Sequence, residues 1–294
     1  MQVRRYGLAL TATALAAVMA VSGCAKKKDD KTTTGSSGGT SSGIVAKAKG
    51  GTLTVGVKFD QPSLGLKGPN GPEGFDVDVA NYIAKKLGAS KVEFKEAISA
   101  NRETFLQNGN VDMVIATYSI TAKRLPLVTF GGPYIITHQD IMVRKNDSSI
   151  TSLASLKGKN VCAVKGSNSW KNITDGTNKQ NLKVAAKTVD ALNYSDCITK
   201  LKGGTVDAVS TDATILAGFV TQNPTLKVVN APFTDEKYGV GLKKGDTSGC
   251  TAVNQAITSM YSDGTAKQLW DKWFGPTKAN LPFDATQPPA QGCS

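Results

Sequence analysis

Apolar and polar positions along the first half of the chain follow two alternating periods. Residues 52–58 (T-L-T-V-G-V-K) have the two-residue period of a strand. Residues 76–88 then place apolar side chains on one helical face and end at Gly88. The same order continues with a strand, a helix and a strand, at residues 91–97, 101–109 and 111–116. Strands that alternate with helices predict an α/β fold with largely parallel sheets.

The second half repeats this style. Strands are expected at 160–165, 182–189 and 206–210, a helix at 194–201, and a further apolar segment at 213–220. Residues 143–149 and 230–238 have the character of crossings between two lobes. A final helical stripe returns the chain to the first lobe, and its members are Ala266, Leu269, Trp270, Trp273 and Phe274. The two tryptophans are interpreted as packing residues rather than ligand contacts.

One motif occurs twice. The pattern L-x-x-G-x-V-D-x-V begins at Leu106 and again at Leu201. Duplication would explain it, and so would two unrelated helix-turn-strand units that each need a glycine at the helix end and a β-branched strand. If the repeat is real, Thr117 corresponds to Asp212, and two similar lobes offer equivalent strand ends. A weaker echo pairs Lys58 with Lys165, each at the end of a short apolar strand.

The first 50 residues have the layout of an export signal and a tether. Two arginines precede an apolar run at residues 8–21, which is shorter than the roughly 20 residues that span a membrane. The run ends in V-S-G-C, which resembles the lipobox of bacterial lipoproteins and predicts cleavage before Cys24 and acylation of its sulfur. An ordinary cleaved signal is the alternative. Residues 24–50 are rich in Gly, Ser and Thr and are expected to be flexible.

The charge of the chain is concentrated in this leader. The whole chain carries +12, and residues 1–50 hold eight Lys or Arg and two Asp, so +6 belongs to the leader and tether. The remaining +6 is spread over residues 51–294 without a concentrated basic block, so nucleic acid is not an expected partner. A basic tether instead suits an anionic lipid surface.

Cysteine use fits an exported protein. With Cys24 acylated, an even set remains, namely Cys162, Cys197, Cys250 and Cys293. Four cysteines allow three pairings. Cys162 with Cys197 and Cys250 with Cys293 are favoured because each pair would stay within one lobe, and four unpaired thiols are the alternative. Neither C-x-x-C nor a Cys/His cluster occurs, so no metal site is expected.

The densest polar segment is residues 115–124, I-A-T-Y-S-I-T-A-K-R, where an apolar strand ends in hydroxyls and an arginine. Such a strand end is typical of a site for a small charged molecule. Catalytic motifs are few: there is no Gly-rich phosphate loop and no G-x-S-x-G, and the one histidine, His138, lies within an apolar strand where a structural role is expected. The balance favours binding over catalysis, with no cofactor.

Several segments together resemble the type II periplasmic-type solute-binding proteins of polar amino acid ABC importers, most closely the glutamate-binding lipoproteins of actinobacteria. The matching segments are V-G-V at 55–57 and residues 72–80, 109–124, 130–134, 164–169 and 206–212. The resemblance implies two α/β lobes, joined by two hinge crossings, that close over one amino acid. It places lobe 1 at 51–144, lobe 2 at 145–233 and the return to lobe 1 with the C-terminal tail at 234–294.

The resemblance also assigns binding roles. Arg124 matches the arginine that grips the ligand α-carboxylate, for which a planar guanidinium is suited. Asp212 matches the aspartate that pairs with the α-ammonium. The other expected contacts are Thr117 and Ser119, the loop residues Gly166, Ser167 and Asn168, and the side-chain readers Lys58 and Lys165. No aromatic residue stands near Ala100 and Asn101, where relatives often have one, and Arg102 is either an extra contact or a solvated arginine.

Three cations against Asp212 give an expected site charge near +2, which favours a dicarboxylate over a neutral zwitterion. Glutamate is therefore the expected ligand, with aspartate and glutamine as alternatives. The predicted protein is a monomer that is lipid-anchored outside the cell membrane and serves an ABC permease. Rival hypotheses are a dehydratase-like enzyme that uses Glu73 or Asp212, an adhesive lipoprotein and a sensor.

Overall fold

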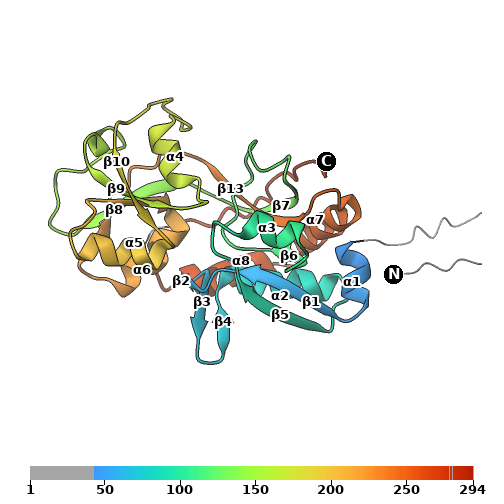
Figure 1. The fold of residues 1–294 in the computed structure, drawn as a ribbon. Coiled ribbons are helices and arrows are strands. Elements are labelled where there is room, and N and C mark those ends of the chain that lie inside the picture. The colour runs from blue at the N-terminus through green and yellow to red at the C-terminus, as the bar shows by residue number, and fades with distance from the viewer. Residues whose placement is uncertain (1–42, 278, 280, 294) are drawn as a thin grey trace, which may run out of the picture. The chain divides into compact units, whose positions relative to one another are not determined.

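The computed structural model describes residues 43–277, 279 and 281–293. The chain divides into two units, Met1–Gly39 and Thr40–Ser294, and all described residues belong to the second. The expected signal peptide, the acylated Cys24 and the tether as far as residue 42 lie outside the described residues. Within the second unit the chain forms two α/β lobes (Figure 1). The predicted fold class, two lobes of mixed sheet flanked by helices, is confirmed.

The first lobe is built on a five-stranded sheet. Its strands, in spatial order, are β5 (Lys91–Glu96), β1 (Thr52–Val57), β6 (Met113–Val114), β13 (Glu236–Lys243) and β7 (Val128–Thr137). The strands β5, β1 and β6 are parallel, as the alternating pattern predicts. The strand β13 comes from the far end of the chain and runs antiparallel to both β6 and β7.

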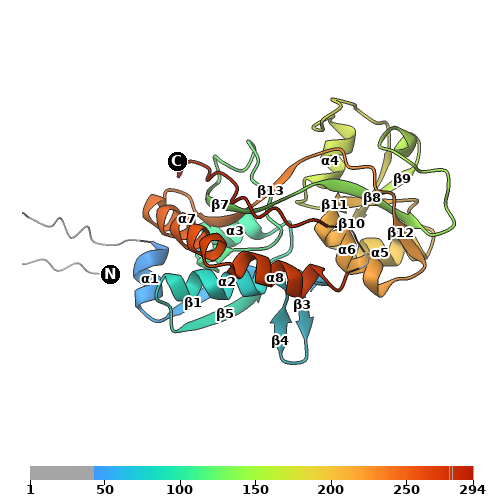
Figure 2. The same cartoon turned by 180° about the vertical axis from the view of Figure 1, so that it is seen from behind.

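Helices cover this sheet, and the C-terminal segment returns to it as predicted (Figure 2). They are α2 (Phe75–Lys86), α3 (Arg102–Gln107), α7 (Thr247–Ser262) and α8 (Thr265–Phe274). In α2 the apolar face read from the sequence is fully buried, and Gly88, with a φ of 91°, follows the helix end. In α8, Trp270 packs on Phe75 and the partly buried Trp273 packs against the same core, so the predicted packing role of the two tryptophans is confirmed.

The end of the expected tether is helical instead of flexible. Helix α1 (Ile44–Lys49) buries Ile44 and Ala48, which are one helical turn apart. The Asp246 carboxylate accepts the Ile44 N–H at 2.8 Å, and the Lys47 ammonium lies 2.8 Å from the Asp112 carboxylate. Two apolar side chains in a polar segment are too weak a pattern to predict a helix. The helix is stabilised by its tertiary contacts.

The second lobe contains two small sheets. One has the order β11 (Val209–Asp212), β8 (Gln139–Arg144) and β12 (Leu226–Val228), and the other pairs β9 (Asn160–Val164) with β10 (Lys187–Ala191). A bridge between Val161 and Ala208 joins them. The helical elements are η1 (Ala154–Leu156), α4 (Ser169–Thr174), α5 (Tyr194–Lys202) and α6 (Ala213–Gln222). The β9–β10 pair is parallel, whereas both pairs of β8 are antiparallel.

A small three-stranded antiparallel sheet, called here the projecting hairpin, extends from the first lobe (Figure 1). It consists of β2 (Asp60–Gln61), β3 (Gly65–Gly68) and β4 (Gly71–Glu73), which pair antiparallel. Glu73, the acid of the enzyme hypothesis, lies on β4 and is exposed.

The first crossing lies earlier than the sequence suggested. Strand β8 pairs with β11 and β12, so residues 139–144 belong with the second lobe and not with the first. The chain passes between the sheets at His138, which is half-buried and whose carbonyl oxygen accepts the Ala213 N–H at 2.8 Å. Strands β7 and β8 are separated only by His138, so no loop in the sequence marks the change of sheet. The return crossing precedes β13, within the expected residues 230–238.

The repeated motif has the same structure in both lobes. Asp112 accepts the Thr54 N–H at 2.7 Å, and the equivalent Asp207 accepts the Asn160 N–H at 2.8 Å. Gly109 and Gly204 end their helices with φ values of 68° and 78°. The motif aspartate thus fastens the helix-turn-strand unit to the first strand of its own lobe. This shared bonding supports duplication over coincidence.

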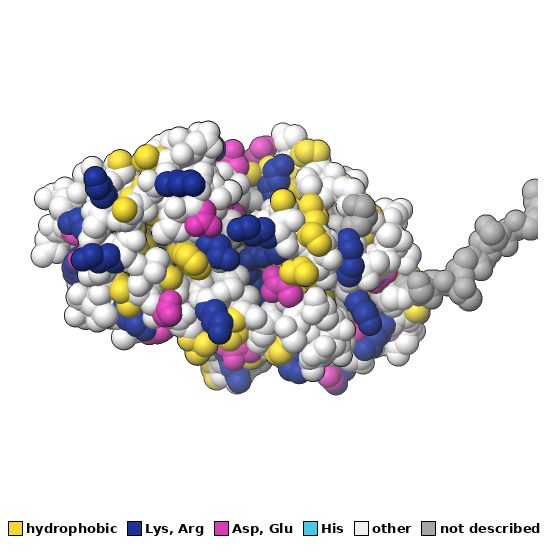
Figure 3. Space-filling model, turned by 45° about the horizontal axis from the view of Figure 1, so that its top comes forward, with side chains coloured by type: hydrophobic (Ala, Val, Ile, Leu, Met, Phe, Trp, Pro, Cys, Tyr) yellow, Lys and Arg dark blue, Asp and Glu magenta, His cyan; other side chains and the backbone are white. Residues whose placement is uncertain are grey.

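Both favoured disulfides are present. Cys162 on β9 bonds to Cys197 on α5, and Cys250 on α7 bonds to Cys293 in the tail. On the face shown in Figure 3, lysine and arginine side chains are spread over the surface with acidic and apolar side chains between them. Among the described residues, no helix has the length and hydrophobicity needed to cross a membrane.

Candidate functional site

A small polar cavity, partly open to solvent, lies between the two lobes. The first lobe contributes Ser99, Arg102, Thr117, Ser119 and Arg124, and the second contributes Ser167, Asn168, Ser169, Tyr194, Asp212 and Ile215. Thr117 and Asp212, the equivalent positions of the repeat, therefore face one cavity. The strand ends of two similar units meet there, where the chain crosses from β7 into β8 and later returns into β13.

Arg124 is held on three sides. Its guanidinium donates to the Ser119 carbonyl oxygen at 2.7 Å and to the Gly166 carbonyl oxygen of the other lobe at 3.1 Å. Its Nε lies 3.4 Å from the Glu103 carboxylate. The side chain is 8 % exposed, so its charge is almost removed from water. A guanidinium fixed in this way presents its planar face and remaining donor directions without further ordering.

Arg102 is buried beside it. Its guanidinium donates to the carbonyl oxygens of Ala116, Thr117 and, across the cavity, Gly166. Its Nε has no hydrogen-bond partner among the described residues. Burial, reinforced by the neighbouring Arg124, lowers the pKa of Arg102 to about 10. The solvated alternative for this arginine is therefore wrong, because its side chain is enclosed by the cleft.

Tyr118 explains how two guanidinium groups can share this space. Its buried ring lies 4.3 Å from the Arg102 guanidinium carbon and 4.9 Å from that of Arg124. The negative face of an aromatic ring attracts cations and offsets part of their mutual repulsion. Tyr118 also packs edge-on against Phe130 at 4.8 Å, which fixes the ring.

Thr117 occupies a strained backbone conformation at the end of the first-lobe strand. Its φ of 45° is in the left-handed region, which a β-branched residue rarely adopts. The Asp76 carboxylate accepts its N–H at 2.8 Å and also accepts the Tyr134 hydroxyl at 2.8 Å. Asp76 is fully buried, and burial raises its pKa to about 6. The strain is thus maintained by a buried network at the place where the ligand would lie.

Asp212 ends β11 in the second lobe and is 5 % exposed. The Tyr238 hydroxyl donates to its carboxylate at 2.6 Å. Burial, with the nearby Glu236 carboxylate, raises the pKa of Asp212 well above its ordinary value. Desolvation and like charge both disfavour the ionised form, so a ligand cation in the cavity would stabilise it.

The loop at residues 166–168 brings the second lobe against the first. Gly166 has a φ of 79°, and a Cβ there would lie 2.5 Å from the Ser99 carbonyl oxygen. Only glycine combines this conformation with this approach. Its carbonyl oxygen accepts from both arginines, while Ser167 and Asn168 line the cavity.

Lys58 and Lys165, the lysines paired by the weaker repeat, lie in different environments. Lys58 is 3 % exposed and donates to the cavity residue Ser99 at 2.9 Å. Burial, reinforced by Arg102, lowers the pKa of Lys58 to about 7. Lys165 is exposed and lines an outer groove with Trp170, Asp190 and Leu192. The structure therefore places Lys165 outside the cavity, although Ser167 and Asn168, which follow it in the chain, line the cavity.

The cavity includes residues that the sequence did not suggest, namely Ser99, Ser169, Tyr194 and Ile215. Tyr194 is an aromatic residue of this lining that comes from the second lobe. A search within one segment could not find it, since the contact crosses lobes. Glu73 does not line the cavity, so the enzyme hypothesis retains only Asp212 there.

The charge of the lining differs from the expected +2. Two arginines and one aspartate give 2 − 1 = +1, with Lys58 one side chain behind Ser99. Among the described residues, no group of three or more His, Cys, Asp or Glu side chains is placed to hold a metal ion.

Two α/β lobes, hinged by antiparallel strands around a charged cavity, define a type II periplasmic-type solute-binding protein. The chain belongs to the bacterial extracellular solute-binding proteins of family 3, whose pattern matches residues 53–276. It is 42% identical over 285 residues to the glutamate-binding protein GluB of Corynebacterium glutamicum, covering 92% of this chain and 90% of that protein. It is 38% identical to the glutamine-binding protein GlnH of Bacillus subtilis, covering 76% of this chain and 81% of that protein.

Solved structures agree on the fold. An ancestral arginine-binding protein bound to arginine has 40% sequence identity and a TM-score of 0.70, and the match covers 76% of this chain and 99% of that one. An ancestral amino acid-binding protein described as a precursor of cyclohexadienyl dehydratase has 31% identity and a TM-score of 0.69, covering 79% and 99%.

Proposed function

We propose that this protein is an extracytoplasmic receptor that closes over one acidic amino acid, with glutamate favoured, and delivers it to an ABC importer. The observation that carries the proposal is the charge of the cavity: two arginines and one aspartate give a net +1. Glutamate, with two carboxylates and one ammonium, has a net −1 and would balance this charge. A neutral zwitterion would leave the buried Arg102 without a carboxylate partner, which is costly.

The roles follow from position. Arg124, with Ser119 and Thr117, would bind the α-carboxylate, and Asp212 would bind the α-ammonium. Arg102 would bind the side-chain carboxylate, since it is the second cation of the lining and its Nε has no partner among the described residues. Ser99, which accepts a hydrogen bond from Lys58, connects this lysine to the same end of the cavity. The loop residues Gly166, Ser167 and Asn168 would close over the ligand.

The relatives support an amino acid ligand without fixing its side chain, because their names include glutamate-, glutamine- and arginine-binding proteins. The paired arginines distinguish among these ligands. An arginine ligand would add a third guanidinium to the cavity, and glutamine would offer an uncharged amide to Arg102. Glutamate and, with a shorter reach, aspartate suit the site better.

The location and assembly of the receptor are also part of the proposal. Cleavage before Cys24 and its acylation would anchor the protein on the outer face of the cell membrane, and the residues up to 42 would act as the tether. Two acyl chains suffice for stable anchoring. The receptor would act as a monomer, with the lobes at about 51–138 and 139–235 and the rest of the chain returning to the first lobe.

Calorimetric titration against glutamate, aspartate, glutamine and arginine tests the function. We expect glutamate to bind most tightly and to be recovered unaltered after incubation. Tightest binding of glutamine or arginine would contradict the assignment of an acidic ligand. Conversion of the ligand to a product would instead support the enzyme hypothesis, with Asp212 as the acid or base.

Raising the pH above 7 is expected to weaken glutamate binding through Lys58, whose pKa is about 7. A bound carboxylate favours the charged lysine, so binding must take up a proton once Lys58 is neutral in the free protein. The dissociation constant should rise between pH 7 and 8.5, by at most about tenfold per pH unit. Titrations in this range, repeated with Lys58→Met, measure the effect, and the variant should lack the slope. A wild-type affinity independent of pH would contradict the role of Lys58.

The two lysines should respond differently to replacement by methionine. Lys58→Met is expected to reduce glutamate affinity by about 1 to 2 kcal/mol and glutamine affinity by less, because it removes a buried cation near the side-chain carboxylate. Lys165→Met should leave both affinities within about 0.5 kcal/mol, because exposed charges contribute little. Titration of both variants with both ligands decides the point. A larger effect at Lys165 would show that it, not Lys58, reads the ligand.

A further inference from the structure

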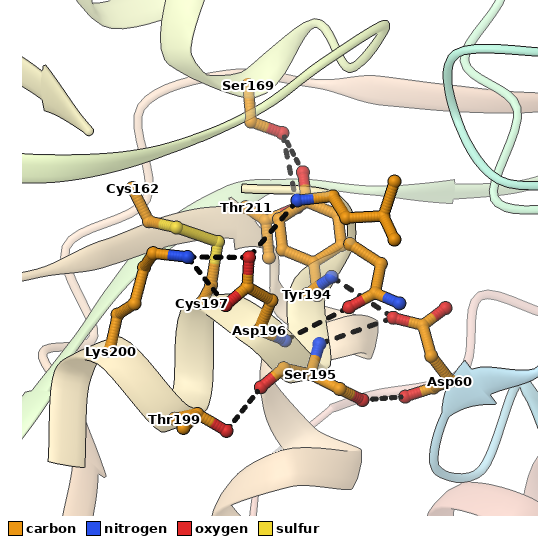
Figure 4. The surroundings of a disulfide bond; sticks show 12 residues. Asp60, Cys162, Ser169, Tyr194, Ser195, Asp196, Cys197, Thr199, Lys200 and Thr211 are labelled. Atoms are coloured by element: carbon orange, nitrogen blue, oxygen red, sulfur yellow. Dashed lines mark hydrogen bonds and ion pairs between the residues drawn. A yellow bond between two sulfur atoms is a disulfide. The ribbon is translucent and has the colours of Figure 1, made fainter. Parts of the chain in front are cut away.

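The first turn of α5 is capped by the opposite lobe. The side chain of its own N-cap, Asn193, accepts the Asp196 N–H at 3.0 Å. The N–H groups of Tyr194 and Ser195 donate to the Asp60 carboxylate at 3.0 and 3.3 Å, and the Ser195 hydroxyl donates to the Asp60 carbonyl oxygen at 2.9 Å (Figure 4). Free N–H groups at a helix start favour a carboxylate partner.

Asp60 belongs to the first lobe. It is the first residue of β2 and pairs with Leu66 in the projecting hairpin. It does not line the cavity between the lobes. The bonds from α5 to Asp60 therefore join the lobes at a place that is separate from the charged lining.

A second contact lies next to the first. Gly218 in the middle of α6 packs on Pro62, and a Cβ at Gly218 would overlap the Pro62 carbonyl oxygen. Gly218 is buried, and glycine within a helix is destabilising relative to alanine. Its presence allows the helix to approach the first lobe closely. The segment from Asp60 to Pro62 thus contacts two helices of the second lobe.

The α5 contact is connected to the binding loop by a covalent bond. Cys197 on α5 is bonded to Cys162 on β9 (Figure 4). Strand β9 ends at Val164, directly before the loop of Gly166, Ser167 and Asn168. A movement of α5 away from Asp60 is therefore passed to the strand that carries this loop.

We propose that the Asp60 carboxylate on α5, together with the Gly218–Pro62 contact, is a latch that stabilises the closed lobes without contacting the ligand. The inference rests on the proposed function, since closure over a ligand gives the latch its purpose. A contact that the open form lacks raises the population of the closed form with or without ligand, and ligand release must break this contact first. Every ligand that closes the lobes benefits from the latch equally.

The test measures dissociation rates of glutamate and glutamine by stopped flow. Asp60→Ala should raise both rates about tenfold, with association rates changed less than about twofold, because the loss of a charged hydrogen bond affects the closed state. Ser195→Ala should raise them about threefold. Thr199→Ala, one turn further along α5, removes a hydroxyl that bonds only to the Ser195 carbonyl oxygen and should change neither rate.

Equality between the two ligands separates the latch from an indirect effect. Asp60 also raises the pKa of Lys58 by its charge, so its loss could act on the side-chain carboxylate alone. Such an effect would be confined to glutamate and would overturn the latch, as would unchanged rates for both ligands. Ser195→Ala keeps all charges and provides the check.

Gly218→Ala tests the steric contact. The added methyl group should raise both dissociation rates at least tenfold, because α6 can no longer reach Pro62. Gly203→Ala is the matched control, since a Cβ there would have as its nearest neighbour the Thr199 carbonyl oxygen at 3.4 Å, within the same helix. Unchanged rates in Gly218→Ala would contradict the proposal, and circular dichroism would verify that each variant folds.

Failure of the proposed function has a different signature. If the wild-type protein binds none of the amino acids, the function is wrong, and the latch is then tested by amide hydrogen exchange at Tyr194 and Ser195 without ligand. Asp60→Ala should accelerate exchange at both amides relative to the wild type and Thr199→Ala. Equal exchange in all three proteins would overturn the latch.

Discussion

Replacing Arg124 by alanine is expected to weaken glutamate binding by about 3 to 5 kcal/mol, or two to more than three decades in the dissociation constant. The ligand α-carboxylate would lose its guanidinium partner inside a closed cavity. The hydrogen bond from Arg124 to the Gly166 carbonyl oxygen, which joins the lobes, would be lost at the same time. Titration calorimetry gives the affinity, and Arg124→Lys, which keeps the charge without the planar fork, should recover only part of it.

The neighbouring Lys123 provides the matched control. It is exposed, and Lys123→Ala removes one positive charge from the same loop without removing a cavity residue. Its affinity for glutamate should stay within about 0.5 kcal/mol of the wild type. If Arg124→Ala binds glutamate as tightly as Lys123→Ala does, Arg124 does not hold the ligand.

Replacing Arg102 by methionine is expected to alter ligand preference more than any other single change. Methionine retains an unbranched side chain but removes the second cation of the lining. Glutamate affinity should fall by about 3 kcal/mol and glutamine affinity by about 1 kcal/mol, because only glutamate places a second charge against this residue. Part of the loss is common to both ligands, since Arg102 also donates to the Gly166 carbonyl oxygen of the other lobe.

Arg144 offers a close comparison for this variant. Its guanidinium also bonds to backbone carbonyl oxygens, those of Leu201 and Val206, but it lies outside the cavity. Arg144→Met should lower the melting temperature without changing the ratio of glutamate to glutamine affinity. Equal losses for the two ligands in Arg102→Met would show that Arg102 supports the cleft and does not recognise the ligand side chain.

Local patterns predicted the elements best where one face of a helix or strand is buried. The face of α2 is an example, since Val79, Ala80, Ile83 and Ala84 recur at helical spacing and are all buried. The repeated motif was also informative beyond its own length. The repeat predicts that Thr117 and Asp212 lie at corresponding strand ends, and both residues line the cavity.

The sequence was a poorer guide to the direction in which a side chain points. Lys58 and Lys165 follow similar strands, yet one is buried beside Ser99 and the other is exposed. The environment of Arg102, in the cavity or in solvent, could not be predicted for the same reason. A side chain at a strand end can point either toward the other lobe or toward solvent. The local sequence does not specify which, because the position of the other lobe depends on distant contacts.

Local sequence is enough to predict the alternation of strands and helices and the corresponding positions of the repeated motif, and it favours, among three possible pairings, the two disulfides that the structure contains. These depend on period, spacing and local hydrogen bonding, which neighbouring residues specify. Three features follow from tertiary contacts alone. Strand β8 joins the second lobe, and Arg102 and Tyr194 face the cavity. Asp60 caps a helix of the opposite lobe. Those contacts join residues far apart in the chain, and they exist because two lobes approach each other closely enough to exclude water.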